Sequence, residues 1–162
     1  MLAPALKRLE VRAAREEDLP AALKLLEWER QKNPWMDRTR ELLVEAVRGR
    51  GAEYLACVAE RDGELVGFAV YGVVAGAIGT GTIAAILVGP RSRRAGIGHR
   101  LLEYGAADLA ARRIRVLFAE VPGDTQLLRY RALLISYGFY EETRIDDYYR
   151  DGVPQIISRL DL

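Results

Sequence analysis

The sequence contains little cysteine or histidine: one of each among 162 residues. Cys57 cannot form an internal disulfide by itself, so a reducing compartment, the cytoplasm, is the expected location. The only histidine, His99, lies in a glycine-containing turn and leaves Cys57 without a partner. A zinc site and a Ser-His-Asp triad are therefore both unexpected, and no metal is predicted.

A strong charge of either sign is also missing. The 24 lysines and arginines nearly balance the 23 aspartates and glutamates, which leaves a formal net charge of +1. Neither nucleic acid nor an acidic membrane surface is therefore an expected partner. No signal peptide is expected, because Lys7 and Arg8 follow only a short, weakly apolar start. The length suits one core, and residues 1–162 are predicted to form a single domain.

One stretch, residues 65–90, lacks charged side chains altogether and is long enough to span a bilayer. Glycines interrupt it repeatedly, and valine, isoleucine and aromatic residues lie between them. That composition indicates two buried strands joined by a glycine-rich turn rather than a membrane helix. A membrane is therefore not an expected partner.

The pattern of apolar residues and turn signals predicts an α/β chain. Asp18 is expected to cap the first helix, and residues 28–37 interrupt the helical pattern before a second helix at 39–48. Asp62-Gly63 is typical of a two-residue hairpin. Strands are predicted over residues 9–13, 54–60, 64–74, 82–88, 115–121, 139–146 and 153–160, with further helices from the turn at Gly98 to about 112 and over 125–137.

The turn between the fourth predicted strand and its following helix carries two glycines, Gly96 and Gly98. A helix N-terminus presents unpaired N–H groups and the positive end of the helix dipole, and glycine lets an anion approach the backbone closely. Arg93 and Arg94 add charged donors. The turn is therefore predicted to bind a pyrophosphate, although a tight turn with solvated arginines would give the same pattern.

Two other phosphate-binding motifs fit less well. A P-loop needs Lys and then Ser or Thr after its last glycine, where this chain has His99 and Arg100. The dinucleotide fingerprint needs a third glycine, and only two fit here. A nucleotide-binding module of either kind is therefore disfavoured.

The run Arg93-Arg94-Ala95-Gly96-Ile97-Gly98 resembles the acetyl-CoA-binding motif of the GNAT superfamily of N-acetyltransferases, which reads Arg or Gln, two residues, Gly, one residue, and Gly or Ala. The predicted order of strands and helices is also that of the family, from about Val11 to Leu160. The end of the last helix, Tyr137-Gly138-Phe139, and the hairpin around Tyr148-Tyr149 resemble the family as well.

The resemblance implies a single α/β domain with a mixed sheet of about seven strands, splayed fourth and fifth strands, and about four flanking helices. It implies acetyl-CoA as cosubstrate. The backbone of Ile86, Leu87 and Val88 would pair with the pantetheine arm and offer an N–H to the thioester oxygen. The pyrophosphate would lie on the turn formed by Arg93, Arg94, Ala95, Gly96, Ile97, Gly98 and His99.

Acetyl transfer to an amine requires a deprotonated amine, a stabilised oxyanion and a leaving thiolate. Deprotonating a lysine of pKa about 10.4 at pH 7 costs about 4.6 kcal/mol, against about 1.4 kcal/mol for an α-amine of pKa about 8. A general base therefore matters more than a general acid. The acid of the family's matching Glu-Val acts on the amine proton, which makes Glu120 the candidate base; a strand-end carboxylate paired with an arginine is the alternative.

The sequence departs from the family at two positions. The acid that other members carry early in the fourth strand is missing near Thr82, and Leu134 occupies the place of the usual proton-donating tyrosine. Tyr130 lies one turn earlier on the same helical face and is the candidate acid, with Tyr137 as the alternative. Either ring could instead belong to the core.

The expected function is an acetyl-CoA-dependent N-acetyltransferase that acetylates a primary amine, on a protein, a peptide or a small molecule. The alternative, suggested by Thr82 and Leu134, is a non-catalytic acyl-CoA-binding or regulatory domain. The sequence leaves open the identity of the acceptor, the length of the acyl group and the formation of a homodimer.

Overall fold

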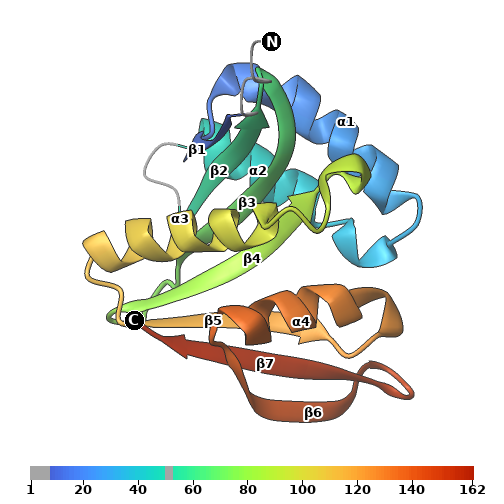
Figure 1. The fold of residues 1–162 in the computed structure, drawn as a ribbon. Helices are drawn as coiled ribbons and strands as arrows, with labels where there is room; N and C mark the ends of the chain where they lie inside the picture. Colours follow the sequence, from blue (N-terminus) through green and yellow to red (C-terminus); the bar gives the residue numbers. More distant parts are fainter. Residues whose placement is uncertain (1–7, 50–52) are drawn as a thin grey trace.

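The computed structural model describes residues 8–49 and 53–162, so most of the stretch that bears on a signal peptide lies outside the described residues. A seven-stranded mixed sheet with the order β1-β2-β3-β4-β5-β7-β6 forms the centre (Figure 1). The strands are β1 (Leu9–Ala13), β2 (Tyr54–Arg61), β3 (Glu64–Val73), β4 (Thr80–Val88), β5 (Val116–Pro122), β6 (Tyr140–Arg150) and β7 (Val153–Asp161); the helices are α1 (Leu19–Arg30), α2 (Thr39–Arg48), α3 (Ile97–Ala111) and α4 (Leu128–Tyr137).

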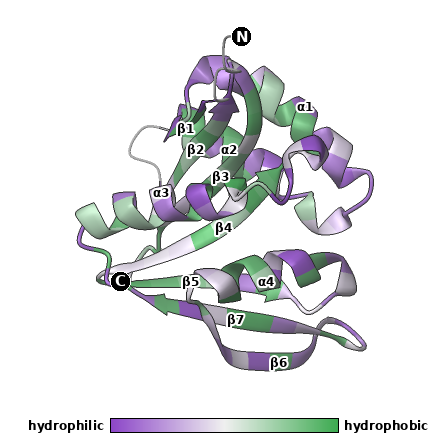
Figure 2. Cartoon of the chain, viewed as in Figure 1, coloured by the Kyte–Doolittle hydropathy of each residue, from purple (hydrophilic) through white to green (hydrophobic). Residues whose placement is uncertain are grey.

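The uncharged stretch forms β3 and β4, as the sequence predicted. Asp62 and Gly63 make the turn between β2 and β3, and both have a positive φ, 53° and 81°, as a two-residue hairpin requires. Green, apolar strands lie at the centre of the molecule in Figure 2, whereas purple residues gather on the outer faces of the helices and on β6. No helix in the described part of the chain is long and apolar enough to span a membrane.

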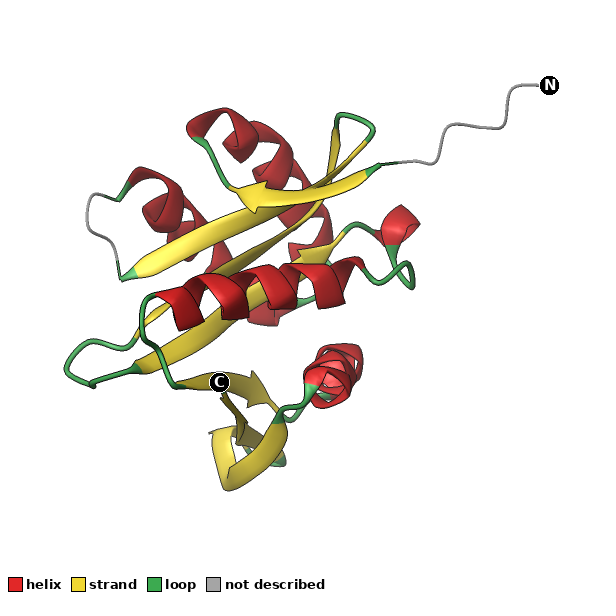
Figure 3. Cartoon of the chain, turned by 60° about the vertical axis from the view of Figure 1, so that its left-hand side comes forward, coloured by secondary structure: helices red, strands yellow, loops and turns green. Residues whose placement is uncertain are grey.

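The helices cover both faces of the sheet (Figure 3). On one face, α1 and α2 pack through Leu26 and Leu43 against strand residues such as Phe68. On the other face, α3 packs through Leu101 and α4 packs through Leu134. The two apolar layers hold the sheet between them, and this arrangement fixes the positions of the strand ends that form the site.

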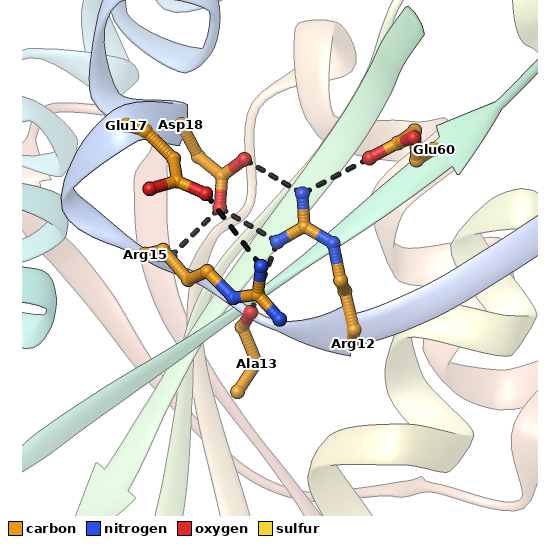
Figure 4. A network of polar contacts seen from close by, with 6 residues as sticks. All are labelled: Arg12, Ala13, Arg15, Glu17, Asp18 and Glu60. Atoms are coloured by element: carbon orange, nitrogen blue, oxygen red, sulfur yellow. Dashed lines mark hydrogen bonds and ion pairs between the residues drawn. The ribbon is translucent and has the colours of Figure 1, made fainter. Parts of the chain in front are cut away.

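The prediction that the side chain of Asp18 caps the first helix is wrong. Asp18 ends a 3-10 turn (Glu16–Asp18) before α1, and its carboxylate makes no capping bond to α1. Instead it accepts two hydrogen bonds of 2.8 Å from the Arg12 guanidinium and one of 2.7 Å from the Arg15 N–H (Figure 4). Arg12 also donates to Glu60 at 3.0 Å. Arg12, a partly buried arginine of the first strand, thus binds the carboxylate, and the network joins β1, β2 and the residues that lead into α1.

Strands β4 and β5 separate after a short parallel contact. They pair only from Thr80 to Thr82, opposite Val116 to Phe118. Beyond that point β4 stays paired with β3, whereas β5 continues with β7 on the other side, and the two strands diverge in Figure 1. The predicted fold class, with splayed fourth and fifth strands, is confirmed.

The separation leaves one edge of β4 open. The N–H of Gly89 bonds to Val66 of β3, so peptide groups point toward β3 at Gly89 and Leu87 and away from it at Ile86 and Val88. The backbone of Leu87 is therefore turned toward β3, unlike the expectation for this residue. Ile86 and Val88 present their peptide groups to the gap between β4 and β5.

Candidate functional site

A cavity of about 590 Å³ lies where β4 and β5 separate. Its walls come from the end of β4, the N-terminus of α3, the end of β5, α4 and the connection between α1 and α2. The residues that line it are Glu29, Asn33, Trp35, Met36, Thr39, Ala84, Ala85, Ile86, Leu87, Val88, Ser92, Arg93, Arg94, Gly96, Ile97, Gly98, His99, Glu120, Val121, Pro122, Gln126, Leu127, Arg129, Tyr130, Leu133 and Ser136. All the predicted site residues except Ala95 belong to this lining.

The N-terminus of α3 opens into this cavity. The first hydrogen bond within the helix runs from the Arg100 N–H to the Gly96 carbonyl, at 3.1 Å. The N–H groups of Ile97, Gly98 and His99 precede it and have no intrahelical acceptor. They lie at the positive end of a helix of 15 residues, which is a suitable position for an anion.

The two glycines of the turn serve different purposes. Gly96 has a φ of +74°, and a Cβ added to it would meet nothing within 4 Å, so the backbone there is open to a ligand. A Cβ on Gly98 would lie 2.9 Å from Leu133, so this glycine allows α3 and α4 to pack closely. The residues present thus fit a pyrophosphate group at the turn, with space at Gly96 and free N–H groups after it.

The two motif arginines have different surroundings. The Nε of Arg93 donates to the Val88 carbonyl at 3.0 Å, and its Nη2 lies 2.6 Å from a carboxylate oxygen of Glu29. This side chain is held by the protein rather than presented to a phosphate, which the sequence could not indicate. Arg94 is exposed and has no acidic partner within ion-pair distance among the residues described. Arg129 of α4 also lines the cavity and was missed from the sequence.

Glu120 lies at the end of β5 and is exposed to the cavity. Its Oε2 accepts a hydrogen bond of 3.0 Å from the Nε2 of Gln155, a buried residue of β7. Within the described part of the chain no arginine forms an ion pair with Glu120. The alternative prediction, a carboxylate paired with an arginine, therefore has no support there. A carboxylate in this position is free to accept a proton from a group in the cavity.

Tyr130 lines the same cavity, and its hydroxyl is buried. Within residues 8–49 and 53–162 this oxygen is the one buried side-chain polar atom without a hydrogen-bonding partner. Burial raises the pKa of Tyr130, so the hydroxyl stays protonated at any ordinary pH. Leu134 is fully buried in the core, and Tyr137 packs against His99 with ring centroids 4.9 Å apart, outside the lining.

An aromatic contact joins the α1–α2 connection to strand β6 beside the cavity. Asn33 accepts a hydrogen bond of 3.1 Å from the N–H of Trp35 and so shapes the 3-10 turn Pro34–Met36. The Trp35 ring meets Tyr149 of β6 edge to face, at 5.1 Å. The connection between α1 and α2 therefore touches the β6–β7 hairpin, and Trp35 of this contact also lines the cavity.

Cysteine and metal chemistry find little support in the described residues. Cys57 is buried, and burial raises the pKa of its thiol to about 12, so it stays a neutral thiol. Among the residues that the structure describes, no group of histidine, cysteine, aspartate or glutamate side chains is arranged to hold a metal ion. The groups at the cavity are thus a carboxylate, a phenol and backbone N–H donors.

Comparison with known proteins places these features in a family. The model of the acetyltransferase (GNAT) family matches residues 20–130. A GNAT-family structure from Desulfovibrio desulfuricans is 27% identical, with a TM-score of 0.85, covering 95% of this chain and 99% of the other. The ribosomal-protein-S18-alanine N-acetyltransferase from Escherichia coli is 25% identical, with a TM-score of 0.70 and coverage of 95% and 94%. Ard1 from Thermoplasma volcanium, at 18% identity, shares the fold, with a TM-score of 0.75 and coverage of 95% and 97%. A comparison with curated protein sequences gives no significant match.

Proposed function

Because the chain belongs to the acetyltransferase (GNAT) family, we propose that it is an acetyl-CoA-dependent N-acetyltransferase that acts by direct attack of a primary amine. The observation that carries the proposal is a single cavity with the free N–H groups of α3 at one end and Glu120 and Tyr130 beyond the open edge of β4. Anion-binding and proton-transfer groups thus lie along one continuous space.

In this proposal the turn from Arg93 to His99 holds the pyrophosphate of acetyl-CoA. The N–H groups of Ile97, Gly98 and His99 and the side chain of Arg94 would bind the phosphates. Arg93 contributes through its backbone and by holding the end of β4 in place. The peptide group of Ile86 and the N–H of Val88 would pair with the amides of the pantetheine arm, and an N–H from this edge would stabilise the thioester oxyanion.

The proposed reaction moves two protons. Glu120 takes a proton from the amine as the amine nitrogen forms its bond to the acetyl carbon. The bond between carbon and sulfur then breaks, and the Tyr130 hydroxyl gives its proton to the departing sulfur. The proton on Glu120 returns to Tyr130 through water. An acceptor that enters as the ammonium ion first gives one further proton to solvent through Glu120, so the products are an N-acetylated amine, CoA with a free thiol and one released proton.

An N-terminal α-amine is the acceptor that the available support favours. The similar protein from Escherichia coli acts on an alanine of a ribosomal protein, by its name. Deprotonating an α-amine costs about 1.4 kcal/mol at pH 7, so a single exposed carboxylate is sufficient to assist it. A lysine side chain or a small-molecule amine would need more help from Glu120.

The test is turnover of acetyl-CoA with a panel of amines. Peptides with a free N-terminus, the same peptides with a blocked N-terminus and an internal lysine, polyamines and small amines would be compared by thiol release and by mass of the product. We expect thiol release to match acetylated product for at least one acceptor. Acetyl-CoA binding without turnover for any amine would instead favour a non-catalytic acyl-CoA-binding domain, which the absence of a tyrosine at Leu134 supports.

A further inference from the structure

We propose that Gln155 is a positioning residue that holds the Glu120 carboxylate in its productive orientation. The inference rests on the proposed function, in which Glu120 accepts the amine proton. Gln155 lies on β7, outside the motif and outside the cavity lining, and would act only through Glu120.

The two side chains lie next to each other on one face of the sheet. β5 and β7 are antiparallel, with Glu120 opposite Ile157 and Pro122 opposite Gln155. Residues two apart on a strand share a face, so Gln155 is the diagonal neighbour of Glu120. The bond from the Gln155 Nε2 to the Glu120 Oε2 is 3.0 Å long.

The burial of Gln155 is costly unless its amide is bonded. Only 5% of the residue is exposed, and it is one of few buried polar residues in the described part of the chain. An unpaired amide there would be destabilising, whereas an apolar side chain of similar size would not be. The bond to Glu120 is the side-chain hydrogen bond that Gln155 makes within the described residues. The amide of Gln155 is thus satisfied by a carboxylate of the cavity.

The consequence concerns the orientation of Glu120. Its side chain is exposed and has three rotatable bonds, so by itself it would occupy several rotamers. The bond to Oε2 restricts these rotamers and leaves Oε1 without a protein partner among the residues described. A displacement of about 1 Å in a reacting group lowers the reaction rate by up to ~10²-fold. Holding the carboxylate in one orientation should therefore raise the rate by a measurable factor.

The experiment is a double-mutant cycle between Gln155→Met and Glu120→Gln. Methionine keeps the length and apolar contacts of the side chain and removes the donor. We expect Gln155→Met to lower kcat about tenfold, with KM for acetyl-CoA unchanged, when Glu120 is present. In the Glu120→Gln background the same substitution should change kcat less than twofold, because nothing is left to position.

Controls separate positioning from stability. Ile156→Val, at the next residue of β7, should lower the melting temperature while leaving kcat unchanged. If Gln155→Met misfolds, Gln155→Leu repeats the test with a smaller apolar side chain. An equal fall in kcat in both backgrounds, or no fall with Glu120 present, would overturn the role of Gln155. Full activity of Glu120→Gln would remove the proposed base and this inference together, whereas absence of acetyl transfer by the unaltered protein would refute the proposed function itself.

Discussion

At the scale of single residues, Glu120 and Tyr130 both line the cavity but have opposite surroundings. Glu120 is exposed and hydrogen-bonded to Gln155, so water and an incoming ligand can reach its carboxylate. The Tyr130 hydroxyl is buried and has no partner in the described part of the chain, so it keeps its proton. In the proposed reaction, these surroundings leave the base accessible to the incoming amine and keep the acid protonated until the thiolate leaves.

Replacing Glu120 with glutamine removes the charge and keeps the shape. We expect turnover to fall about 10²-fold for a lysine-like acceptor at pH 7. The loss should shrink as pH rises toward the pKa of the acceptor, because the amine then deprotonates without help. Profiles of kcat/KM between pH 7 and 10 for both proteins test this. A loss that is the same at every pH would assign Glu120 a structural role.

Replacing Tyr130 with phenylalanine removes only the unpartnered hydroxyl. Turnover should fall about tenfold to thirtyfold, since protonating the thiolate contributes about 2 kcal/mol at most. The affinity for acetyl-CoA should not change, and the melting temperature should stay the same or rise, because a buried polar group without a partner is lost. Single-turnover kinetics and thermal melts would be measured together. Tyr137→Phe is the matched control, because its ring lies outside the cavity lining.

At the scale of elements, β1 and the start of α1 are joined by charges rather than by a helix cap. The Arg12 guanidinium, with help from the Arg15 N–H, holds the pKa of Asp18 below its usual value of 3.8. Arg12 is 21% exposed and Asp18 is 10% exposed at the side chain, so solvent screens this pair only partly. The network fixes the angle at which the chain enters α1, and hence the position of the α1–α2 connection beside the cavity.

Acid titration tests this network. A carboxyl whose pKa is lowered by folding stabilises the protein fully above its unfolded pKa of about 3.9, and this stabilisation is lost as pH falls through the folded value. Asp18→Asn should therefore destabilise the protein at pH 7 by about 2 kcal/mol, or ~4–8 °C in melting temperature. The difference from the unaltered protein should narrow below pH 4. Urea melts at several pH values measure it, and a difference that stays constant down to pH 2 would contradict the assignment.

The fold could be predicted well from sequence because its signals are local. Apolar runs and turn signals predicted every strand, and most strand ends differ from the structure by no more than two residues. Strand β6 is an exception, since it continues to Arg150. The bend before α2 was placed too early, because α1 continues to Arg30 before the 3-10 turn.

The candidate site was predictable only where a motif carried it. The α3 turn has a local sequence pattern, and the structure places it at the cavity. The partners of its residues come from distant parts of the chain and leave no local pattern. Glu29 binds Arg93 across 64 positions, and Gln155 binds Glu120 across 35. Asp18 likewise has the sequence position of a helix cap, and only the structure shows that Arg12 of β1 binds its carboxylate.

At the scale of the whole molecule, the sheet consists of two parts that meet through three residue pairs of β4 and β5. Strands β1 to β4 form one part, and β5 to β7 form the other. The cavity lies between them, and Trp35, which lines it, contacts Tyr149 of the second part. A ligand in the cavity would touch both parts and would therefore stabilise the assembled sheet.

Acetyl-CoA should consequently raise the melting temperature. At a concentration of 100 Kd the stabilisation is about 2.7 kcal/mol, which is ~5–11 °C for a protein of this size. Gly98→Glu should abolish the shift, because it adds a negative charge beside the phosphates and a side chain against Leu133. Gly63→Glu, in the remote β2–β3 turn, is the control for a charged residue replacing glycine. A full shift in Gly98→Glu would place the pyrophosphate elsewhere.

The open edge of β4 also determines how its amide protons exchange with water. The N–H groups of Ile86 and Val88 point into the gap, while the N–H of Leu87 is bonded to β3. Exchange at the first two needs no separation of strands, whereas exchange at Leu87 needs local unfolding. Deuterium uptake followed residue by residue should therefore alternate between fast and slow along the end of β4. Acetyl-CoA should slow exchange at the N–H groups of Ile86 and Val88 and leave exchange at Leu87 unchanged. Protection by the ligand should therefore appear at every second amide of the strand.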